Sequence, residues 1–228
     1  VETDQTREIP NLIANLKSRE DKDIYLVAEI NVCRDALYAS RSSTVCLRTE
    51  LGGNYTDEGG SWLDPYNTEL RQYVIELCRE LYDMGFDEVV LASVLHPTIT
   101  DEETKLVYTR DMSSPPSAVN AVCGFAVSIA DALQDRAGRL SIYCYSRKAL
   151  VGPDTANGQD ATLFMKVFDR VYHPTDKGTY VYNMEDIASR VPLGKAEYRF
   201  VPVVVNYLPS PSDSISWVLI DKEEKTED

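Results

Sequence analysis

The side chains that could do chemistry in this chain gather near the ends of short apolar segments. Glu29 and Asn31 lie in the run from Ile24 to Cys33, where alternation puts both on one side of a strand and Ala28 and Ile30 on the other. A carboxylate in that position could serve as the acid or the base of a hydrolytic reaction. The position also suits a carboxylate that only forms a salt bridge or a hydrogen bond inside the fold, and this structural role is the favoured interpretation of Glu29.

Both histidines of the chain, His96 and His173, follow an apolar segment and stand next to a proline. As a pair they could bind a ligand or carry protons near neutral pH. No acidic motif accompanies them, so the sequence favours loop packing over a metal site. A nucleophile elbow, a glycine-rich phosphate loop and a zinc-binding helix motif are missing from the sequence. We therefore expect neither a metal nor a cofactor.

Tyrosine is frequent, with 14 in 228 residues, and several tyrosines fall where predicted strands end. An aromatic face with a polar edge can stack on a sugar ring or pack against a partner protein. Ordinary interleaving of tyrosine in strands accounts for most of them. The candidate binding residues are therefore Asn31, Tyr143, Tyr145, His96, His173 and Tyr207.

These residues are positioned by strands that alternate with helices, which is typical of parallel βα units. The predicted strands are 24–33, 89–95, 140–145, 167–172, 199–207 and 214–220, and the predicted helices are 9–17, 67–84, 117–135, 159–165 and 184–191. In the second helix Leu70, Val74, Leu77 and Cys78 recur at spacings of three and four, and Gly85 ends it. Six strands in this order are two fewer than a complete eightfold barrel contains.

Composition bounds the class of protein. A length of 228 residues with 43% hydrophobic residues suits one domain, 1–228, whose residues 221–228 form an acidic tail. The formal charge of -14 repels a phosphate backbone, so nucleic-acid binding is not expected. No apolar run reaches about 18 residues, and we expect no membrane insertion. The five cysteines lack CxxC spacing and are expected to be buried free thiols, with Cys33 and Cys46 the pair to test for a bridge.

The stretch Trp62-Leu-Asp-Pro-Tyr-Asn67, followed by Gly85-Phe-Asp-Glu88, resembles a bacterial family of glycoside-hydrolase-like (β/α)8 barrel domains that is distantly related to α-amylase-type barrels. The similarity runs in collinear order through most of the chain and includes Arg34-Asp35, Gly158-Gln159 and Trp217-Leu219. It implies an α/β fold of the TIM-barrel type whose six strands correspond to barrel strands three to eight, with the first two upstream of Val1 or absent. It also implies a carbohydrate ligand and an extracellular or cell-envelope location.

In such barrels the site lies at the carboxyl ends of the strands, and there this chain departs from the family pattern. Six mouth positions that are polar or aromatic in the family have lost that chemistry here: Val90, Ala92, Leu95, Tyr143, Val205 and Ile220. Most glycosidases need two carboxyl groups that flank the scissile bond, which Ala92 and Tyr143 cannot supply. Tyr143 could act as a nucleophile only with a neighbouring acid, so we favour a filler or sugar-stacking role.

The remaining acids near predicted strands have structural interpretations. Asp87, Glu88 and Asp169 stand where strands begin, which is the stability end of such a barrel. Asp64 is expected to order its loop and to cap the helix that follows.

The resemblance therefore favours a carbohydrate-related domain that does not hydrolyse its ligand. The first alternative is an active glycosidase led by Glu29 and helped by Asp221 or Asp160. The second alternative is a structural or interaction module that is completed by an upstream segment or by self-association, because two open sheet edges tend to find partners.

Overall fold

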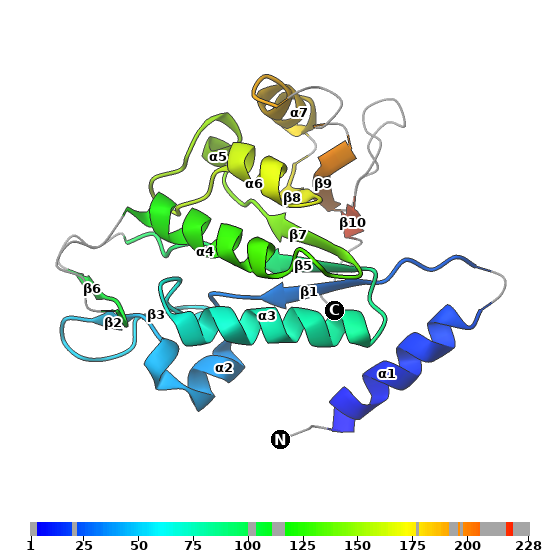
Figure 1. The fold of residues 1–228 in the computed structure, drawn as a ribbon. Helices are drawn as coiled ribbons and strands as arrows, with labels where there is room; N and C mark the ends of the chain where they lie inside the picture. The colour runs from blue at the N-terminus through cyan, green and yellow to red at the C-terminus, as the bar shows by residue number, and fades with distance from the viewer. Residues whose placement is uncertain are drawn as a thin grey trace, which may run out of the picture.

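The computed structural model describes residues 4–19, 22–99, 104–110, 117–176, 178–191, 196, 198–205 and 218–220. Its centre is a sheet with the strand order β1-β5-β7-β8-β9-β10. These strands are β1 (Val27–Asn31), β5 (Glu88–Ala92), β7 (Arg139–Tyr143), β8 (Val171–Pro174), β9 (Phe200–Val205) and β10 (Val218–Ile220). All neighbouring pairs are parallel, and each connection moves the chain one strand further in the same direction. The sheet curls into a half-barrel, as the predicted incomplete barrel requires (Figure 1).

Helices cover the outer face of this half-barrel (Figure 1). The helices are α1 (Asp4–Lys17), α2 (Ala36–Arg41), α3 (Thr68–Asp83), α4 (Ala118–Ala132), α5 (Arg147–Val151), α6 (Ala161–Val167) and α7 (Tyr180–Ala188), with a short 3-10 turn at Ser43–Val45. Helix α3 packs on α4, and α4 packs on α6, so the helices follow the strands around the sheet.

Local sequence explains the best-defined βα unit, α3 and β5. The Asn67 side chain accepts hydrogen bonds from the backbone N–H groups of Glu69 and Leu70, which fixes the start of α3. Gly85 follows the end of this helix with a φ of 102°, a left-handed conformation that glycine adopts without strain. Strand β5 is buried along its whole length, as a strand in a covered parallel sheet should be.

Alternation along the strands separates two apolar clusters. Outward side chains such as Val89, Leu91 and Ile142 join the large core beneath the helices. Inward side chains form a smaller cluster on the concave face, which consists of Val90, Tyr172, Val201 and Val203 with Tyr143 and Val218 packed against it. The concave face is therefore partly polar and partly solvent-facing, and it is where the candidate residues meet.

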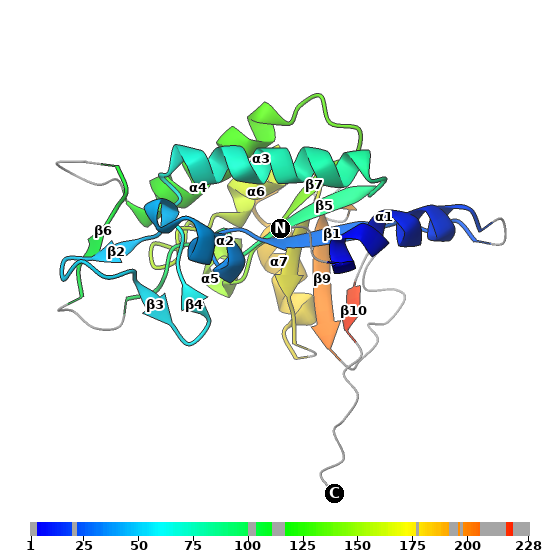
Figure 2. The ribbon, with the colours of Figure 1, turned by 90° about the horizontal axis from the view of Figure 1, so that it is seen from below.

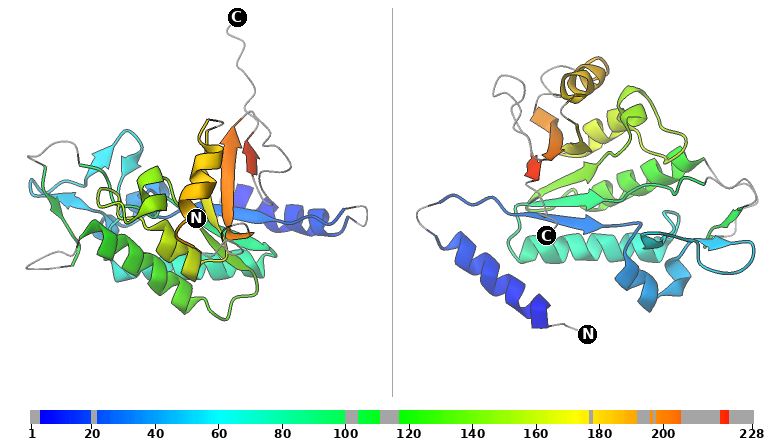
Figure 3. Two further views of the ribbon diagram at one scale, coloured as in Figure 1. Left: turned by 90° about the horizontal axis from the view of Figure 1, so that it is seen from above. Right: turned by 180° about the vertical axis from the view of Figure 1, so that it is seen from behind.

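The polar region 40–60, rich in Gly, Ser and Thr, contains short strands that the sequence did not predict. Here β2 (Arg48–Thr49) pairs with β6 (Leu106–Val107), and β3 (Thr56–Asp57) pairs with β4 (Gly60–Ser61), both antiparallel. These strands lie beyond the carboxyl end of β1 (Figure 2; Figure 3). Runs of two residues are too short to show the alternation that predicts a strand, which explains the miss.

One predicted strand boundary needs correction, and one helix was missed. The predicted strand 167–172 is wrong at its start, because Val167 is the last residue of α6 and the strand begins at Val171. The Asp160 side chain accepts hydrogen bonds from the backbone N–H groups of Thr162 and Leu163 and so caps the start of α6. The helix then includes the apolar residues whose pattern suggested a strand. Helix α5 was not predicted. Of the predicted strand 214–220, only Val218–Ile220 falls within the described residues.

The structure describes the state of the cysteines and the length of the apolar helices. All five cysteines are buried free thiols, so the Cys33/Cys46 bridge is not formed. Among the helices that the structure describes, none is long and apolar enough to span a membrane. The acidic tail 221–228 lies outside the described residues.

Candidate functional site

Three neighbouring strands bring the candidate residues together. In the register of β1 on β5, Glu29 pairs with Val90 and Asn31 pairs with Ala92, and Val90 in turn pairs with Ser141 of β7. Because alternation is conserved across paired strands, Glu29, Asn31 and Tyr143 all face the concave side near the carboxyl ends. We call the group Glu29, Asn31, Ser93, Tyr143 and Tyr145 the strand-end site.

Glu29 is the acidic residue of this site. Its side chain is exposed, and among the described residues no cation forms a salt bridge with it. Tyr143 lies close enough to Glu29 for the Glu29 charge to act on its phenol. Burial, followed by the Glu29 charge, raises the pKa of Tyr143, so its phenol stays protonated near neutral pH. Glu29 is thus not sealed in the interior of the half-barrel.

Tyr145 supplies a fixed aromatic surface beside Tyr143. The two rings stack with centroids 5.4 Å apart and planes 17° apart. The backbone N–H of Ser93 donates to the Tyr145 hydroxyl at 3.1 Å, which holds the ring in place while 37% of the residue remains exposed. Desolvation raises the pKa of this phenol, so the hydroxyl is neutral. A fixed, half-exposed ring pair is a suitable platform for a flat ligand face.

Ser93 connects the two halves of the site and was missed by the sequence argument. Its φ of 55° is unusual for a residue with a side chain. In this conformation its hydroxyl donates to the Asn31 side-chain oxygen at 2.9 Å, while its backbone N–H reaches Tyr145. Backbone of this kind persists only where surrounding contacts hold it, and such positions cluster at functional sites. Nothing in the sequence indicates the positive φ, because serine has no preference for it.

Gln159 joins the carboxyl ends of β5 and β7 through hydrogen bonds. Its amide nitrogen donates to the carbonyls of Val94 and Tyr143 at 3.0 and 2.9 Å, and its amide oxygen accepts from the Tyr145 N–H at 2.8 Å. The residue is fully buried, so these three bonds are its role in the fold. The Gly158-Gln159 pair noticed in the sequence thus supports the site without touching a ligand.

The histidines do not join the strand-end site. His173 alternates with the inward Tyr172 and so faces the helices, where its Nδ1 donates to the Cys144 carbonyl at 2.6 Å. His96 donates from Nδ1 to the Pro97 carbonyl and bonds Tyr108 through Nε2, each at 2.9 Å. Burial lowers the pKa of both histidines. They have no common partner. His96 packs in a loop as expected, whereas His173 lies within β8 and not in the loop after it.

The other candidate residues either lie outside the described residues or are engaged within the fold. Tyr207 and Asp221 lie outside the described residues. Asp160 is occupied as the cap of α6. Asp64 orders its loop by accepting from the N–H groups of Tyr66 and Thr109, as expected, but the cap of α3 is Asn67. Asp176, exposed just after β8, is a strand-end carboxylate that the sequence argument did not single out.

At the opposite end of the sheet, Glu88 is sealed inside the half-barrel. Its carboxylate accepts from the hydroxyls of Ser141, Tyr25 and Tyr172 at 2.6, 2.8 and 2.9 Å and from Arg170 at 2.6 Å. The residue has no exposed surface, and all four bonds point at its two oxygens. Glu88 therefore has the predicted structural role and cannot reach a ligand.

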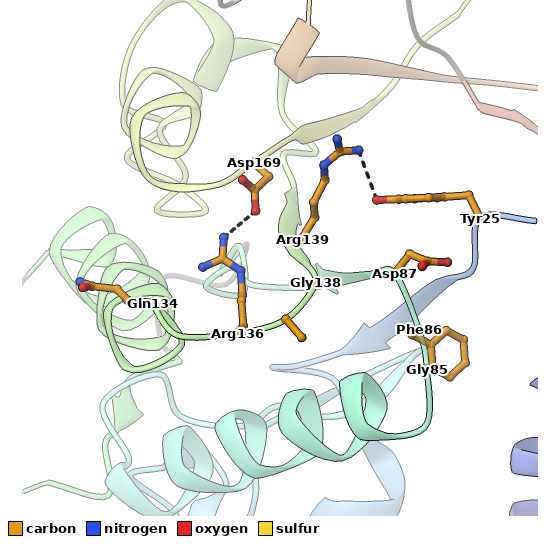
Figure 4. A pocket seen from close by; sticks show the side chains of 10 residues that line it. Tyr25, Gly85, Phe86, Asp87, Gln134, Arg136, Gly138, Arg139 and Asp169 are labelled. Carbon is orange, nitrogen blue, oxygen red and sulfur yellow. Dashed lines mark hydrogen bonds and ion pairs between the residues drawn. The ribbon is translucent and has the colours of Figure 1, made fainter.

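The charged residues that line the pocket beside Glu88 are also engaged in contacts within the fold (Figure 4). It has a volume of 590 Å³ and is lined by Tyr25, Asp87, Arg136, Arg139 and Asp169 among others. In Figure 4 Arg136 reaches Asp169, and Arg139 reaches the Tyr25 hydroxyl. Asp87 pairs with Lys17 of α1 and accepts from the Leu26 N–H. Both carboxylates of this pocket are thus engaged within the fold.

A metal centre has no support in the part of the chain that the structure describes. No group of three or more His, Cys, Asp or Glu side chains there is arranged to hold an ion. The strand-end site offers one carboxylate, one amide and two phenols, which suits hydrogen bonding and stacking.

Comparison with known families agrees with this arrangement. Residues 1–175 match the model of a family described as "Putative glycosyl hydrolase domain". The chain belongs to this family. As a glycosyl hydrolase domain it is a divergent one, because carboxylates are missing from the inward strand-end positions Ala92 and Tyr143. No curated protein matches the sequence.

Solved structures show the same fold. The chain is similar to the PgaB (BpsB) glycoside hydrolase domain from Bordetella bronchiseptica, with 12% identity, a TM-score of 0.56, and 92% of this chain and 73% of that chain covered. It is similar to Aspergillus fumigatus Ega3 in complex with galactosamine, with 10% identity, a TM-score of 0.54, and 93% and 79% covered. The corresponding values for the PelA glycoside hydrolase domain from Pseudomonas aeruginosa are 11%, 0.52, 89% and 74%. At these identities the likeness concerns the fold alone.

Proposed function

We propose that this glycosyl hydrolase domain binds carbohydrate at the strand-end site and does not hydrolyse it. The observation that carries the proposal is Glu29, the single carboxylate among the described inward-facing residues near the carboxyl ends of β1, β5 and β7, next to the stacked rings of Tyr143 and Tyr145. The rings favour a sugar ring, and the lone carboxylate argues against catalysis.

Binding is supported by the chemistry of the site. The face of a sugar ring carries C–H groups that pack on an aromatic ring, while its hydroxyls need polar partners at the edge. Glu29 and Asn31 lie beside the rings and are exposed, so both can bond hydroxyls. The presence of galactosamine in the Ega3 structure supports a sugar on this fold.

The loss of hydrolysis follows from the number of acids. A retaining glycosidase has two carboxyl groups about 5 Å apart, and an inverting one has them roughly 6.5 to 9.5 Å apart. Among the described inward-facing strand residues the second carboxylate is Glu88, which is fully buried at the other end of the sheet and saturated with hydrogen bonds. Glu29 has no described strand partner for a two-acid mechanism.

Binding and turnover should be measured on the same oligosaccharides. We expect glycan binding by calorimetry without release of reducing sugar. Tyr145→Ala should weaken binding about fivefold or more, since a lost stacking residue costs about 1 kcal/mol or more. Tyr198→Ala, which removes an equally large but distant exposed ring, is the matched control and should bind normally. Turnover that a single strand-end substitution abolishes would overturn the proposal.

One observation favours a second candidate, an active glycosidase led by Glu29. Its carboxylate is exposed and lies near Tyr143, and a neighbouring acid is what a tyrosine nucleophile would need. A second acid would come from a loop, and the exposed Asp176 is a described candidate. This candidate predicts that Glu29→Gln and Tyr143→Phe each abolish a turnover that wild type displays.

A further inference from the structure

Among the described residues, no cation forms a salt bridge with Glu29, which lies beside the aromatic rings of the strand-end site. The two described arginines that follow the strands of the site are engaged elsewhere. Arg34, after β1, pairs with Asp57 and lies over the Trp62 ring. Arg147, after β7, pairs with Asp186. The strand-end site therefore has a negative charge that no described side chain neutralises.

The aromatic rings reinforce this charge. The faces of Tyr143 and Tyr145 carry the negative part of the ring quadrupole, which attracts cations. Ring faces beside a carboxylate are the arrangement that recognises ammonium groups. The net charge of the whole chain, -14, adds a long-range attraction for positively charged ligands.

We infer that the strand-end site is selective for sugars that carry a free, protonated amino group, and that Glu29 is the residue that recognises this amine. The inference rests on the proposed carbohydrate binding and names its substrate class. The amine would pair with the Glu29 carboxylate while the sugar ring stacks on Tyr145. An acetylated amine has no charge, so the same sugar with an N-acetyl group keeps the stacking and loses the ion pair.

The contacts fix the geometry of selection. The Ser93 N–H holds the Tyr145 ring, and Glu29 lies near enough to Tyr143 for its charge to act on that phenol, so the carboxylate and the platform are close together before a ligand arrives. Pre-positioned groups lose little freedom on binding. Glu29→Gln keeps the shape of the side chain and removes its charge.

The test compares glucosamine oligomers with N-acetylglucosamine oligomers of equal length, by calorimetry at about pH 6, where a free amine is protonated. We expect the free-amine oligomer to bind about tenfold more tightly, the combined effect of an exposed ion pair and a cation–π contact. Glu29→Gln should erase this difference and leave the N-acetylated oligomer within about twofold of wild type. Glu80→Gln, an equal change of charge on an exposed position of α3, is the matched control and should alter neither affinity.

The outcomes separate this inference from the proposed function. Equal affinity for both oligomers, lost in Tyr145→Ala, would overturn the amine selectivity and leave carbohydrate binding in place. If the Glu29→Gln variant still prefers the free amine, the preference comes from the overall charge of the molecule, and the role of Glu29 is overturned. If neither oligomer nor any other glycan binds, both proposals fail.

Discussion

At the scale of single residues, Ser93 connects Asn31 and Tyr145 of the strand-end site through hydrogen bonds. Its left-handed backbone presents the N–H to Tyr145 and the hydroxyl to Asn31, and a regular strand could not orient both groups in this way. For a residue with a Cβ this conformation costs about 1 to 2 kcal/mol. The surrounding hydrogen bonds must offset that cost, so the site stores a small amount of strain.

This strain gives a prediction about the order of two variants. Ser93→Ala and Ser93→Gly both lose the bond to Asn31, but only glycine relieves the backbone. We expect the glycine variant to be the more stable of the two by about 0.5 kcal/mol, because strain relief exceeds the entropy cost of glycine. Urea denaturation measures the difference. At an ordinary negative φ the order is reversed, so alanine as the more stable variant would contradict the conformation of Ser93.

The two buried histidines predict how stability depends on pH. Burial lowers the folded-state pKa of His96 and His173 below the ordinary value of 6.5, despite the opposing charges of Asp64 and Asp176. As the pH falls below about 6.5, the unfolded chain takes up protons that the folded chain does not, so the free energy of unfolding decreases. Each histidine contributes at most about 1.4 kcal/mol per pH unit.

Denaturation at several pH values between about 5 and 7 tests this linkage. The double variant His96→Gln/His173→Gln should show a shallower fall of stability over this range than wild type, whatever its stability at neutral pH. Identical slopes in the two proteins would contradict the buried, neutral state of the histidines.

At the scale of elements, Glu88 joins β5 to three segments that are distant from one another in the sequence. Its oxygens accept from Tyr25 before β1, from Ser141 of β7, from Tyr172 of β8 and from Arg170 just before β8. The carboxylate thus links the amino-terminal ends of the strands by hydrogen bonds, while Gln159 links their carboxyl ends in the same way. The strand-end site is held between these two sets of bonds.

Removing the charge of Glu88 should therefore destabilise the whole sheet. Glu88→Gln leaves the positive charge of Arg170 without its partner in a largely buried position, which we expect to cost about 3 kcal/mol of unfolding free energy. The amide nitrogen of glutamine would also face hydroxyl donors. Urea denaturation gives the value, with Glu80→Gln as the matched surface control within about 0.5 kcal/mol of wild type. A cost under about 1 kcal/mol would mean that the network is not a principal support.

At the scale of the whole molecule, the alternation of strands and helices predicted parallel βα units, and the resemblance to a barrel family predicted the incomplete barrel. Strand β5 and helix α3 were predicted because each carries a regular apolar pattern. The short strands near Arg48 and Thr56 could not be predicted, since pairing in space defines them. The shared face of Glu29 and Asn31 followed from alternation within one strand. The exposure of Glu29 did not, because it depends on how far the sheet curls around the concave face. The positive φ of Ser93 has no sequence signal at all.

The open sides of the half-barrel lead to a prediction about association. Within the described part of the chain, β1 pairs only with β5 and β10 only with β9, so each has one free edge. Val27 and Ile220 are inward-facing residues on these strands, yet 43% and 39% of their surfaces are exposed. Unpaired edges beside exposed apolar side chains favour strand addition. We therefore expect self-association that increases with protein concentration, measurable by sedimentation velocity.

Charge at the two edges should prevent this association. In Val27→Lys/Ile220→Lys, pairing would bury two ammonium groups against apolar surface, so the variant should sediment as a monomer at concentrations where wild type associates. Leu51→Lys places the same charge on a fully exposed leucine outside the half-barrel and should behave as wild type. If all three proteins are monomers at every concentration, copies of the chain do not complete the barrel. Equal association of all three would place the contact on another surface.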